Sequence, residues 1–309
     1  MVESIFIFIC ALALVIKGAT FSTKYAGNLA SSFGLSKYTV GFIVVAIISI
    51  LPETFVAINS ALAGMSSFGL GTLFGSNVAD MTLIFTIIIL FAKRGIKIES
   101  KILKKNIAYP FLLLVPLVLG IDGYFSRVEG LALIIFGAVF YYMAFKSGSD
   151  FSKAQKSKHS PYKNFFMLLL GMAILIVGSH FTVTSAVNFA NLLHINPILI
   201  GMLLVGLGTT MPELFFAIQA VKKQDDDLAV GDILGTVLAD ATVVVGILAL
   251  INPFSVSQKI IYITGVFMVA ASVILFLFMR SGKSLSKRES YLLFLFWLIF
   301  VLVEFFANK

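Results

Sequence analysis

The chain alternates long apolar stretches with short polar ones. A helix that crosses the hydrocarbon core of a bilayer needs about 20 mostly apolar residues. By that measure the sequence predicts about ten transmembrane helices, the fourth of them short and interrupted by Pro110 and Pro116. The predicted spans are 4–26, 38–62, 69–92, 106–121, 128–146, 165–187, 197–221, 229–251, 259–279 and 290–307. The pattern indicates an all-α polytopic membrane protein.

Composition supports the same class. Of the 309 residues, 59% are hydrophobic and only 12% are charged, and the mean hydropathy is +1.03. A soluble domain carries about 25% charged residues. Cys10 is the single cysteine, which excludes an internal disulfide and any CxxC metal or redox site. The first apolar run is long and carries Glu3 but no basic n-region, so we expect a retained span and not a signal peptide.

Basic residues are concentrated in alternate loops. With ten spans, one side of the membrane receives 19 of the 23 Lys and Arg residues. By the positive-inside rule that side is cytoplasmic, which places both termini outside a cell membrane. The net charge of +8 is explained by this bias, so we expect the lipid bilayer as partner and no nucleic acid.

Two segments of the chain repeat at an offset of 160 residues without a gap. Glu53 matches Glu213 in this register, and Asp80 matches Asp240. A Lys- and Ser-rich linker at 147–163 separates a first unit, 1–146, from a second, 164–309. Because five spans are an odd number, the second unit enters from the opposite side of the membrane. The sequence therefore predicts two inverted five-helix repeats.

Each repeat carries two acids, and each acid has a hydroxyl residue four positions earlier. This spacing puts both side chains on one helix face. The pairs are Ser49 with Glu53, Ser76 with Asp80, Thr209 with Glu213, and Thr236 with Asp240. Oxygen ligands of this kind suit hard cations such as calcium, sodium and magnesium.

Pro52 and Pro212 directly precede the two glutamates. A proline inside a helix frees the carbonyl four residues back, and free carbonyls at membrane depth persist where they line a cavity or bind an ion. We expect the carbonyls near Ile48 and Gly208, and those of Ala46 and Gly206, to become available. A charge near the bilayer centre costs at least about 2.5–3.5 kcal/mol, so the converging acids require bound cations or protons.

Other functions fit the pattern less well. Acids that only join helices by hydrogen bonds need no symmetric, proline-broken copies. A channel needs no inverted repeats, and an intramembrane protease needs two facing catalytic acids in another context. The chain has no P-loop for an ATP-driven pump. We therefore expect a carrier and no enzyme, with transported ions and no prosthetic group.

The two P-E segments, each followed by G-[ST]-x-[VL]-A-D, resemble the alpha repeats of the cation/calcium exchanger superfamily, and most closely those of the short archaeal and bacterial sodium/calcium exchangers. The resemblance implies that the first and sixth helices slide against a core of eight, and that one Ca²⁺ and several Na⁺ compete for a central site. It implies that Glu53 and Glu213 bind calcium and that Asp80 and Asp240 complete the centre. The implied further ligands are the hydroxyls of Ser49, Ser76, Thr209, Thr210 and Thr236 and the carbonyls of Ala46 and Gly206.

The sequence also departs from that pattern. Ile50 stands where the family usually has a serine, Val237 replaces an asparagine, and Asp80 occupies a position that is often asparagine. We predict a monomeric antiporter that exchanges Ca²⁺ for Na⁺ by alternating access. These departures keep an H⁺-coupled exchanger of Ca²⁺ or another divalent cation open. The cluster Asp225, Asp226 and Asp227 is expected to be a solvated turn, with a calcium-attracting mouth as the alternative.

Overall fold

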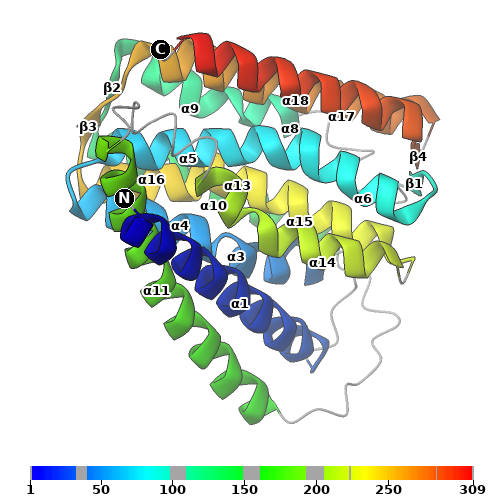
Figure 1. Ribbon diagram of the computed structural model, residues 1–309. Coiled ribbons are helices and arrows are strands. Elements are labelled where there is room, and N and C mark those ends of the chain that lie inside the picture. The colour runs from blue at the N-terminus through cyan, green and yellow to red at the C-terminus, as the bar shows by residue number, and fades with distance from the viewer. Residues whose placement is uncertain are drawn as a thin grey trace.

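A computed structural model describes residues 2–32, 40–97, 109–148, 161–192, 205–222, 224–282 and 284–307. Nearly all of these residues are helical, and the helices form one elongated bundle (Figure 1). Most of the predicted linker lies outside the described residues. Both ends of the described chain lie at the same end of the bundle (Figure 1).

The first repeat contains two broken spans and several continuous ones. Its elements are α1 (Val2–Ser32), η1 (Val40–Val45), α3 (Ala46–Ser49), α4 (Leu51–Leu62), α5 (Ser66–Ala79), η2 (Asp80–Ile84), α6 (Phe85–Ala92), α8 (Tyr109–Leu112), α9 (Leu114–Leu119), η3 (Gly120–Asp122) and α10 (Arg127–Gly148). The fourth span is short and is broken at Leu113 between α8 and α9, as its two prolines predict.

The second repeat reproduces this order. Its elements are α11 (Pro161–Leu192), α13 (Gly206–Thr209), α14 (Met211–Lys222), α15 (Asp226–Ala239), η6 (Asp240–Val244), α16 (Val245–Ile251), η7 (Ile260–Gly265), α17 (Val266–Gly282) and α18 (Lys287–Ala307). Matched capping boxes begin α10 and α18. Glu129 accepts hydrogen bonds from the backbone and hydroxyl of Ser126, and Glu289 does the same for Ser286, 160 residues later.

In the part of the chain that the structure describes, two short strand pairs join the repeats. Strand β1 (Ile96–Lys97) pairs with β4 (Ser284–Leu285), and β2 (Tyr124–Phe125) pairs with β3 (Phe254–Ser255), both antiparallel. Each pair takes one strand from each repeat, and β4 matches β2 in the 160-residue register. The two pairs lie at opposite ends of the bundle (Figure 1). The repeats are therefore inverted, as the sequence predicts.

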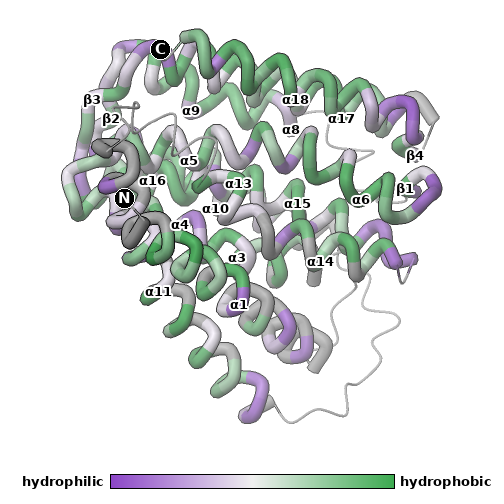
Figure 2. Tube along the Cα trace, viewed as in Figure 1, coloured by the Kyte–Doolittle hydropathy of each residue, from purple (hydrophilic) through white to green (hydrophobic). Residues whose placement is uncertain are grey.

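Within the described residues, five helices are long and apolar enough to cross a membrane: Ser66–Ala92, Arg127–Ala144, Asp226–Ile251, Ile260–Arg280 and Lys287–Ala307. The most apolar windows of Ser66–Ala92 and Asp226–Ile251 are both 83% buried, whereas that of Lys287–Ala307 is 22% buried. The two helices that bear Asp80 and Asp240 thus form the interior, and α18 lies on the outside of the bundle. Apolar positions cover this outer side (Figure 2).

The helices α1 and α11 pack along each other and cross the rest of the bundle at a steep angle (Figure 1). They also touch the proline-broken spans: α1 contacts α3, α13 and α14, and α11 contacts α4. Their outer faces expose large apolar side chains such as Phe6 and Phe166. This pair therefore lies between the outer surface of the bundle and the residues predicted to bind ions.

Candidate ion-binding centre

The spans that carry Pro52 and Pro212 are each interrupted two residues before the proline. The break falls at Ile50 between α3 and α4, and at Thr210 between α13 and α14. Pro52 lies in the first turn of the new helix, where a missing N–H costs least. Glu53 and Glu213 consequently lie in the first turn of α4 and of α14. A helix N-terminus favours negative charge and so supports a carboxylate at this position.

The other two predicted acids begin short π-helical segments. Asp80 is the first residue of η2, and Asp240 is the first residue of η6. A π-bulge inside an α-helix shifts the side chains that follow it and is frequent at functional sites. The bulge occurs at the same position of both repeats, so it is a property of the duplicated unit.

The broken helices of one repeat pack on the acidic helix of the other. Helix α3 and the preceding η1 contact α15, and α13 contacts α5. This crossed packing brings Glu53, Asp80, Glu213 and Asp240 into one fully interior region, each at most 1% exposed. Glu53 lies within electrostatic range of each of the other three carboxylates. The structure thus gathers all four acids named from the sequence.

A fifth acid, Asp232 of α15, belongs to the same cluster. It is fully buried, and it lies within electrostatic range of Glu53, Asp80 and Glu213. Sequence analysis missed it because the repeat comparison matches it to a neutral residue, Thr72. Its presence inside an apolar span was the available signal, since an intramembrane acid marks a functional site by default.

Nine of the ten carboxylate oxygens in this cluster accept no hydrogen bond of normal geometry from the described residues, although the Thr209 side chain lies close enough to Glu53 to interact with it. The exception is Oδ1 of Asp232, which accepts a hydrogen bond of 2.8 Å from Ser49 Oγ. A buried carboxylate without a partner is costly, and five together repel one another. The arrangement is therefore suited to binding positive charge.

The predicted hydroxyl ligands are also fully buried. Most of them donate to carbonyls of their own helices: Ser76 to Leu73 at 3.0 Å, Thr209 to Gly206 at 2.9 Å, Thr210 to Leu207 at 3.1 Å, and Thr236 to Asp232 at 2.8 Å. A hydroxyl that donates backward along its helix keeps its oxygen lone pairs for another group. These four oxygens can therefore accept a cation.

The helix breaks leave fewer backbone carbonyls without a hydrogen bond than the sequence predicts. The Ala46 carbonyl still accepts a 3.0 Å bond from the Ile50 N–H, and the Gly206 carbonyl accepts a 3.1 Å bond from the Thr210 N–H. Each carbonyl oxygen has two lone pairs, so one bond does not exclude a second contact. The role of these two carbonyls as ligands stays a prediction.

Among the described residues, no three His, Cys, Asp or Glu side chains group closely enough to hold a metal ion by themselves. An ion bound here would need hydroxyl or carbonyl oxygens in addition to carboxylates. Such mixed oxygen sets are typical of calcium and sodium sites.

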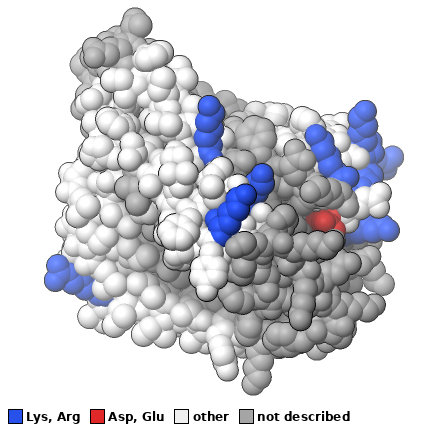
Figure 3. All heavy atoms as spheres, turned by 90° about the horizontal axis from the view of Figure 1, so that it is seen from below, with Lys and Arg blue, Asp and Glu red and all other residues white. Residues whose placement is uncertain are grey.

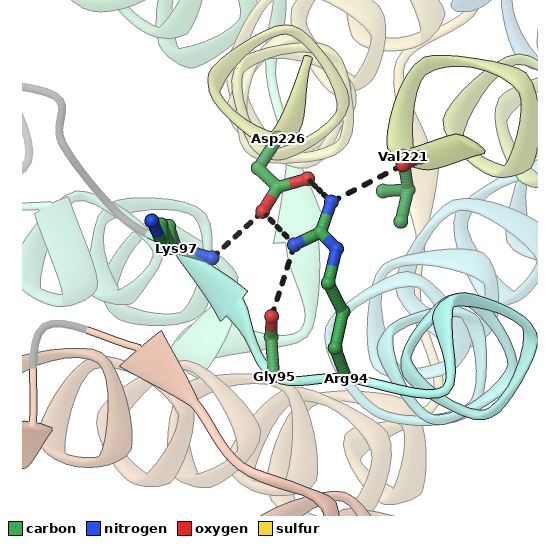
Figure 4. Close-up of polar contacts among 5 residues, drawn as sticks. All are labelled: Arg94, Gly95, Lys97, Val221 and Asp226. Atoms are coloured by element: carbon green, nitrogen blue, oxygen red, sulfur yellow. Dashed lines mark hydrogen bonds and ion pairs between the residues drawn. The ribbon is translucent and has the colours of Figure 1, made fainter. Parts of the chain in front are cut away.

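The expected solvated turn at Asp225–Asp227 is wrong for Asp226. Its side chain is buried and receives two hydrogen bonds from Arg94, at 2.5 and 2.7 Å, and one of 2.8 Å from the Lys97 N–H (Figure 4). Arg94 also donates to the Val221 carbonyl at 3.2 Å. The hydrogen bond with Asp226 raises the pKa of the Arg94 guanidinium. Asp226 therefore anchors the α14–α15 corner and is not open to bind calcium.

Comparison with known proteins agrees with this geometry. The family model described as sodium/calcium exchanger protein matches residues 3–146 and again 163–306. The sodium/calcium exchanger MaX1 of Methanosarcina acetivorans is 25% identical over 97% of this chain and 98% of its own length. The inner membrane protein YrbG of Escherichia coli is 30% identical over 79% of each chain.

Solved structures of the exchanger NCX_Mj share the fold, with a TM-score of 0.74 and 22% identity over 96% of this chain and 97% of theirs. The family model covers most of the chain in two copies, one in each repeat. The chain therefore belongs to the sodium/calcium exchanger protein family.

Proposed function

We propose that this protein is a secondary antiporter that exchanges Ca²⁺ for Na⁺ by alternating access. The observation that carries the proposal is the buried cluster of carboxylates with nine unpartnered oxygens, surrounded by hydroxyls that retain their lone pairs. Such a cluster needs positive charge in every state of a transport cycle. Family membership supports cations as the transported species.

Shared ligands explain how exchange would be enforced. Glu53 and Glu213 would bind Ca²⁺, with Asp80, Asp240 and the nearby hydroxyls completing its surroundings. Sodium ions that arrive from the other side of the membrane and bind the same oxygens would repel the Ca²⁺ ion and displace it. Simultaneous full occupancy is electrostatically unfavourable, so each ion leaves as the other binds.

The α1–α11 pair is the element best placed to alternate access. It packs on both broken spans, and the contact is close at Gly208, where a Cβ atom would come within 2.5 Å of Leu12 Cδ2. Sliding of the pair along this contact would change which side of the membrane reaches Thr209 and Glu213. The remaining helices would act as a fixed core, as inverted-repeat transporters commonly do.

We further propose that the basic end of the bundle is cytoplasmic. Arg94 and Lys97 lie at the end that carries β1 and β4, where Lys and Arg side chains crowd in the view of Figure 3. The termini lie at the other end (Figure 1). The positive-inside rule then places both termini outside, in a monomer that needs no second chain to complete its centre.

Proton coupling is the second candidate. Ile50 is buried where a hydroxyl would support sodium, while Asp80 and Asp232 add acids to the centre. Fewer neutral ligands and more acids favour protons as the counter-ion.

The test is calcium flux into proteoliposomes that contain the purified full chain. Uptake of radioactive Ca²⁺ is compared under an imposed sodium gradient and under an imposed pH gradient. We expect the sodium gradient alone to drive accumulation. Uptake driven only by the pH gradient would replace the proposal with the proton-coupled exchanger, and equilibration without either gradient would indicate a channel.

A further inference from the structure

We propose that Asp232 and Ser49 form a subsite for a monovalent cation at the edge of the calcium centre. The inference rests on the proposed function and adds a binding residue, because none of the sequence motifs includes Asp232. Asp232 lies in α15 of the second repeat and Ser49 in α3 of the first, and α3 packs directly on α15.

The first observation is that Ser49 directs its hydrogen bond differently from the other hydroxyls of the centre. Those hydroxyls donate to carbonyls of their own helices, whereas Ser49 donates to Asp232, 183 residues away, at 2.8 Å. This bond fixes the hydroxyl hydrogen on the carboxylate. The Ser49 oxygen lone pairs and the Asp232 carboxylate are therefore held together as adjacent cation ligands.

The second observation is the remaining oxygen of Asp232. Oδ2 is buried and has no hydrogen-bond partner among the described residues. Asp232 lies within electrostatic range of Glu53, which is one helical turn beyond Ser49. The unpartnered oxygen thus belongs to the same interior region as the calcium carboxylates.

The subsite occurs in only one of the two repeats. Thr72 occupies the matching position in α5, is buried, and donates to its own helix at Phe68 with a bond of 3.0 Å. A neutral residue at the same place shows that the scaffold does not require an acid there. The extra charge of Asp232 therefore has a function that the first repeat lacks.

A single carboxylate with one hydroxyl fits a monovalent ion better than a divalent one. Divalent hard cations gather several charged oxygens, whereas Asp232 and Ser49 offer one carboxylate and one hydroxyl. A bound Na⁺ would neutralise Asp232 and would increase the number of sodium ions that compete with each Ca²⁺. The subsite would thus contribute to exchange stoichiometry.

The experiment measures binding of radioactive Ca²⁺ to purified, detergent-solubilised full-length protein while NaCl is raised at constant ionic strength. We expect sodium to displace calcium from the wild type cooperatively. In Asp232→Asn, we expect the sodium concentration for half-displacement to rise about tenfold or more, because a buried charged ligand is lost. The Hill coefficient for sodium should fall by about one, the loss expected when one of several coupled sites is removed.

Thr72→Val is the matched control, since it removes a buried hydroxyl at the position of the first repeat that corresponds to Asp232. Its sodium dependence should equal that of the wild type. An unchanged half-displacing concentration and Hill coefficient in Asp232→Asn would overturn the inference. If that variant fails to fold, Asp232→Glu keeps the charge but moves it by one methylene. It should shift the half-displacing concentration, and no shift would equally overturn the inference.

The two proposals fail in different ways. Loss of calcium binding is expected in Glu213→Gln, and its persistence would contradict the calcium centre itself. If Na⁺ does not displace calcium from the wild type, both the sodium exchange and the subsite are contradicted. If Na⁺ displaces calcium equally from the wild type and Asp232→Asn, only the subsite falls.

Discussion

The two repeats close the same structural corner with different chemistry. In the second repeat, the turn between α14 and α15 is held by Arg94, which binds the Asp226 carboxylate and the Val221 carbonyl. In the first repeat, the turn between α4 and α5 is held instead by Asn252, which comes from the second repeat. It contacts Ser66 at 3.4 Å and the Ala61 carbonyl at 3.3 Å, and these partners match Asp226 and Val221 in the 160-residue register.

The same contrast recurs at the centre, where the acidic Asp232 of the second repeat corresponds to the neutral Thr72 of the first, and both are buried. Both differences place the additional acid in the second repeat. The duplicated scaffold therefore keeps positions, packing and helix breaks, while the charge at those positions diverges. The carboxylates shared by both repeats are the ones expected to be indispensable, and the unshared ones are expected to modify affinity or anchor the fold.

The largest effect is expected at the shared glutamates. Glu53→Gln and Glu213→Gln should each reduce sodium-driven calcium uptake in proteoliposomes by about a hundredfold or more, because a buried charged ligand is lost. Glu129→Gln is a control, since Glu129 caps a helix outside the centre, and it should keep uptake within about twofold. A Glu213→Gln variant with normal uptake would break the functional equivalence of the repeats.

Removing the two corner contacts tests the difference between charged and neutral anchors. Arg94→Ala should lower the free energy of unfolding by about 2–3 kcal/mol, because it leaves the buried Asp226 carboxylate without its charged partner. We expect less than for a fully buried pair because the Arg94 side chain is 35% exposed. Asn252→Ala should cost only about 1 kcal/mol.

Both corner variants are measured by denaturant unfolding of the detergent-solubilised protein. Equal losses in Arg94→Ala and Asn252→Ala would indicate that the ion pair contributes no more than the neutral contacts. Retained calcium binding in Arg94→Ala would support a structural role for Arg94 and Asp226.

A smaller effect is expected at the unmatched pair Ile50 and Thr210. Ile50→Ser restores a hydroxyl at the break of the first repeat and should lower the half-activating sodium concentration about two- to fivefold, the value of one polar contact. The measurement is the initial rate of calcium uptake against sodium concentration. No change would count against Ile50 as a cause of weakened sodium binding.

Another small effect concerns the residue two positions beyond the end of each glutamate-bearing helix. Gly64 and Gln224 occupy matched positions and both adopt a left-handed backbone, with φ of 73° and 61°. This conformation favours glycine, so Gln224→Gly should stabilise the protein by about 1 kcal/mol. The reverse change, Gly64→Gln, should destabilise it by a similar amount although a Cβ atom at Gly64 meets nothing within 4 Å. Thermal unfolding in detergent measures both variants, and a lower midpoint for Gln224→Gly would contradict the argument.

Much of the fold followed from the sequence because its signals are local. Apolar run length located the spans, Pro52 and Pro212 located the helix breaks, and the gapless 160-residue register predicted inverted repeats. The same register selected Glu53, Asp80, Glu213 and Asp240, which the structure brings together.

The comparison of the two repeats also directed attention away from residues that differ between them. Asp232 matched a threonine and Asp226 looked like a solvated turn, so neither was recognised from the sequence. The π-bulges at Asp80 and Asp240 were likewise not predicted, because a bulge leaves no reliable mark on apolar periodicity.

The sequence by itself determined which side chains enter the membrane, because hydrophobic run length and proline act within one segment. Only the tertiary structure decided which of them meet. The bond from Ser49 to Asp232 joins residues 183 apart, and Arg94 reaches Asp226 across 132 positions. Such pairings depend on the crossed packing of one repeat on the other, and no local pattern encodes the partner of a buried charge.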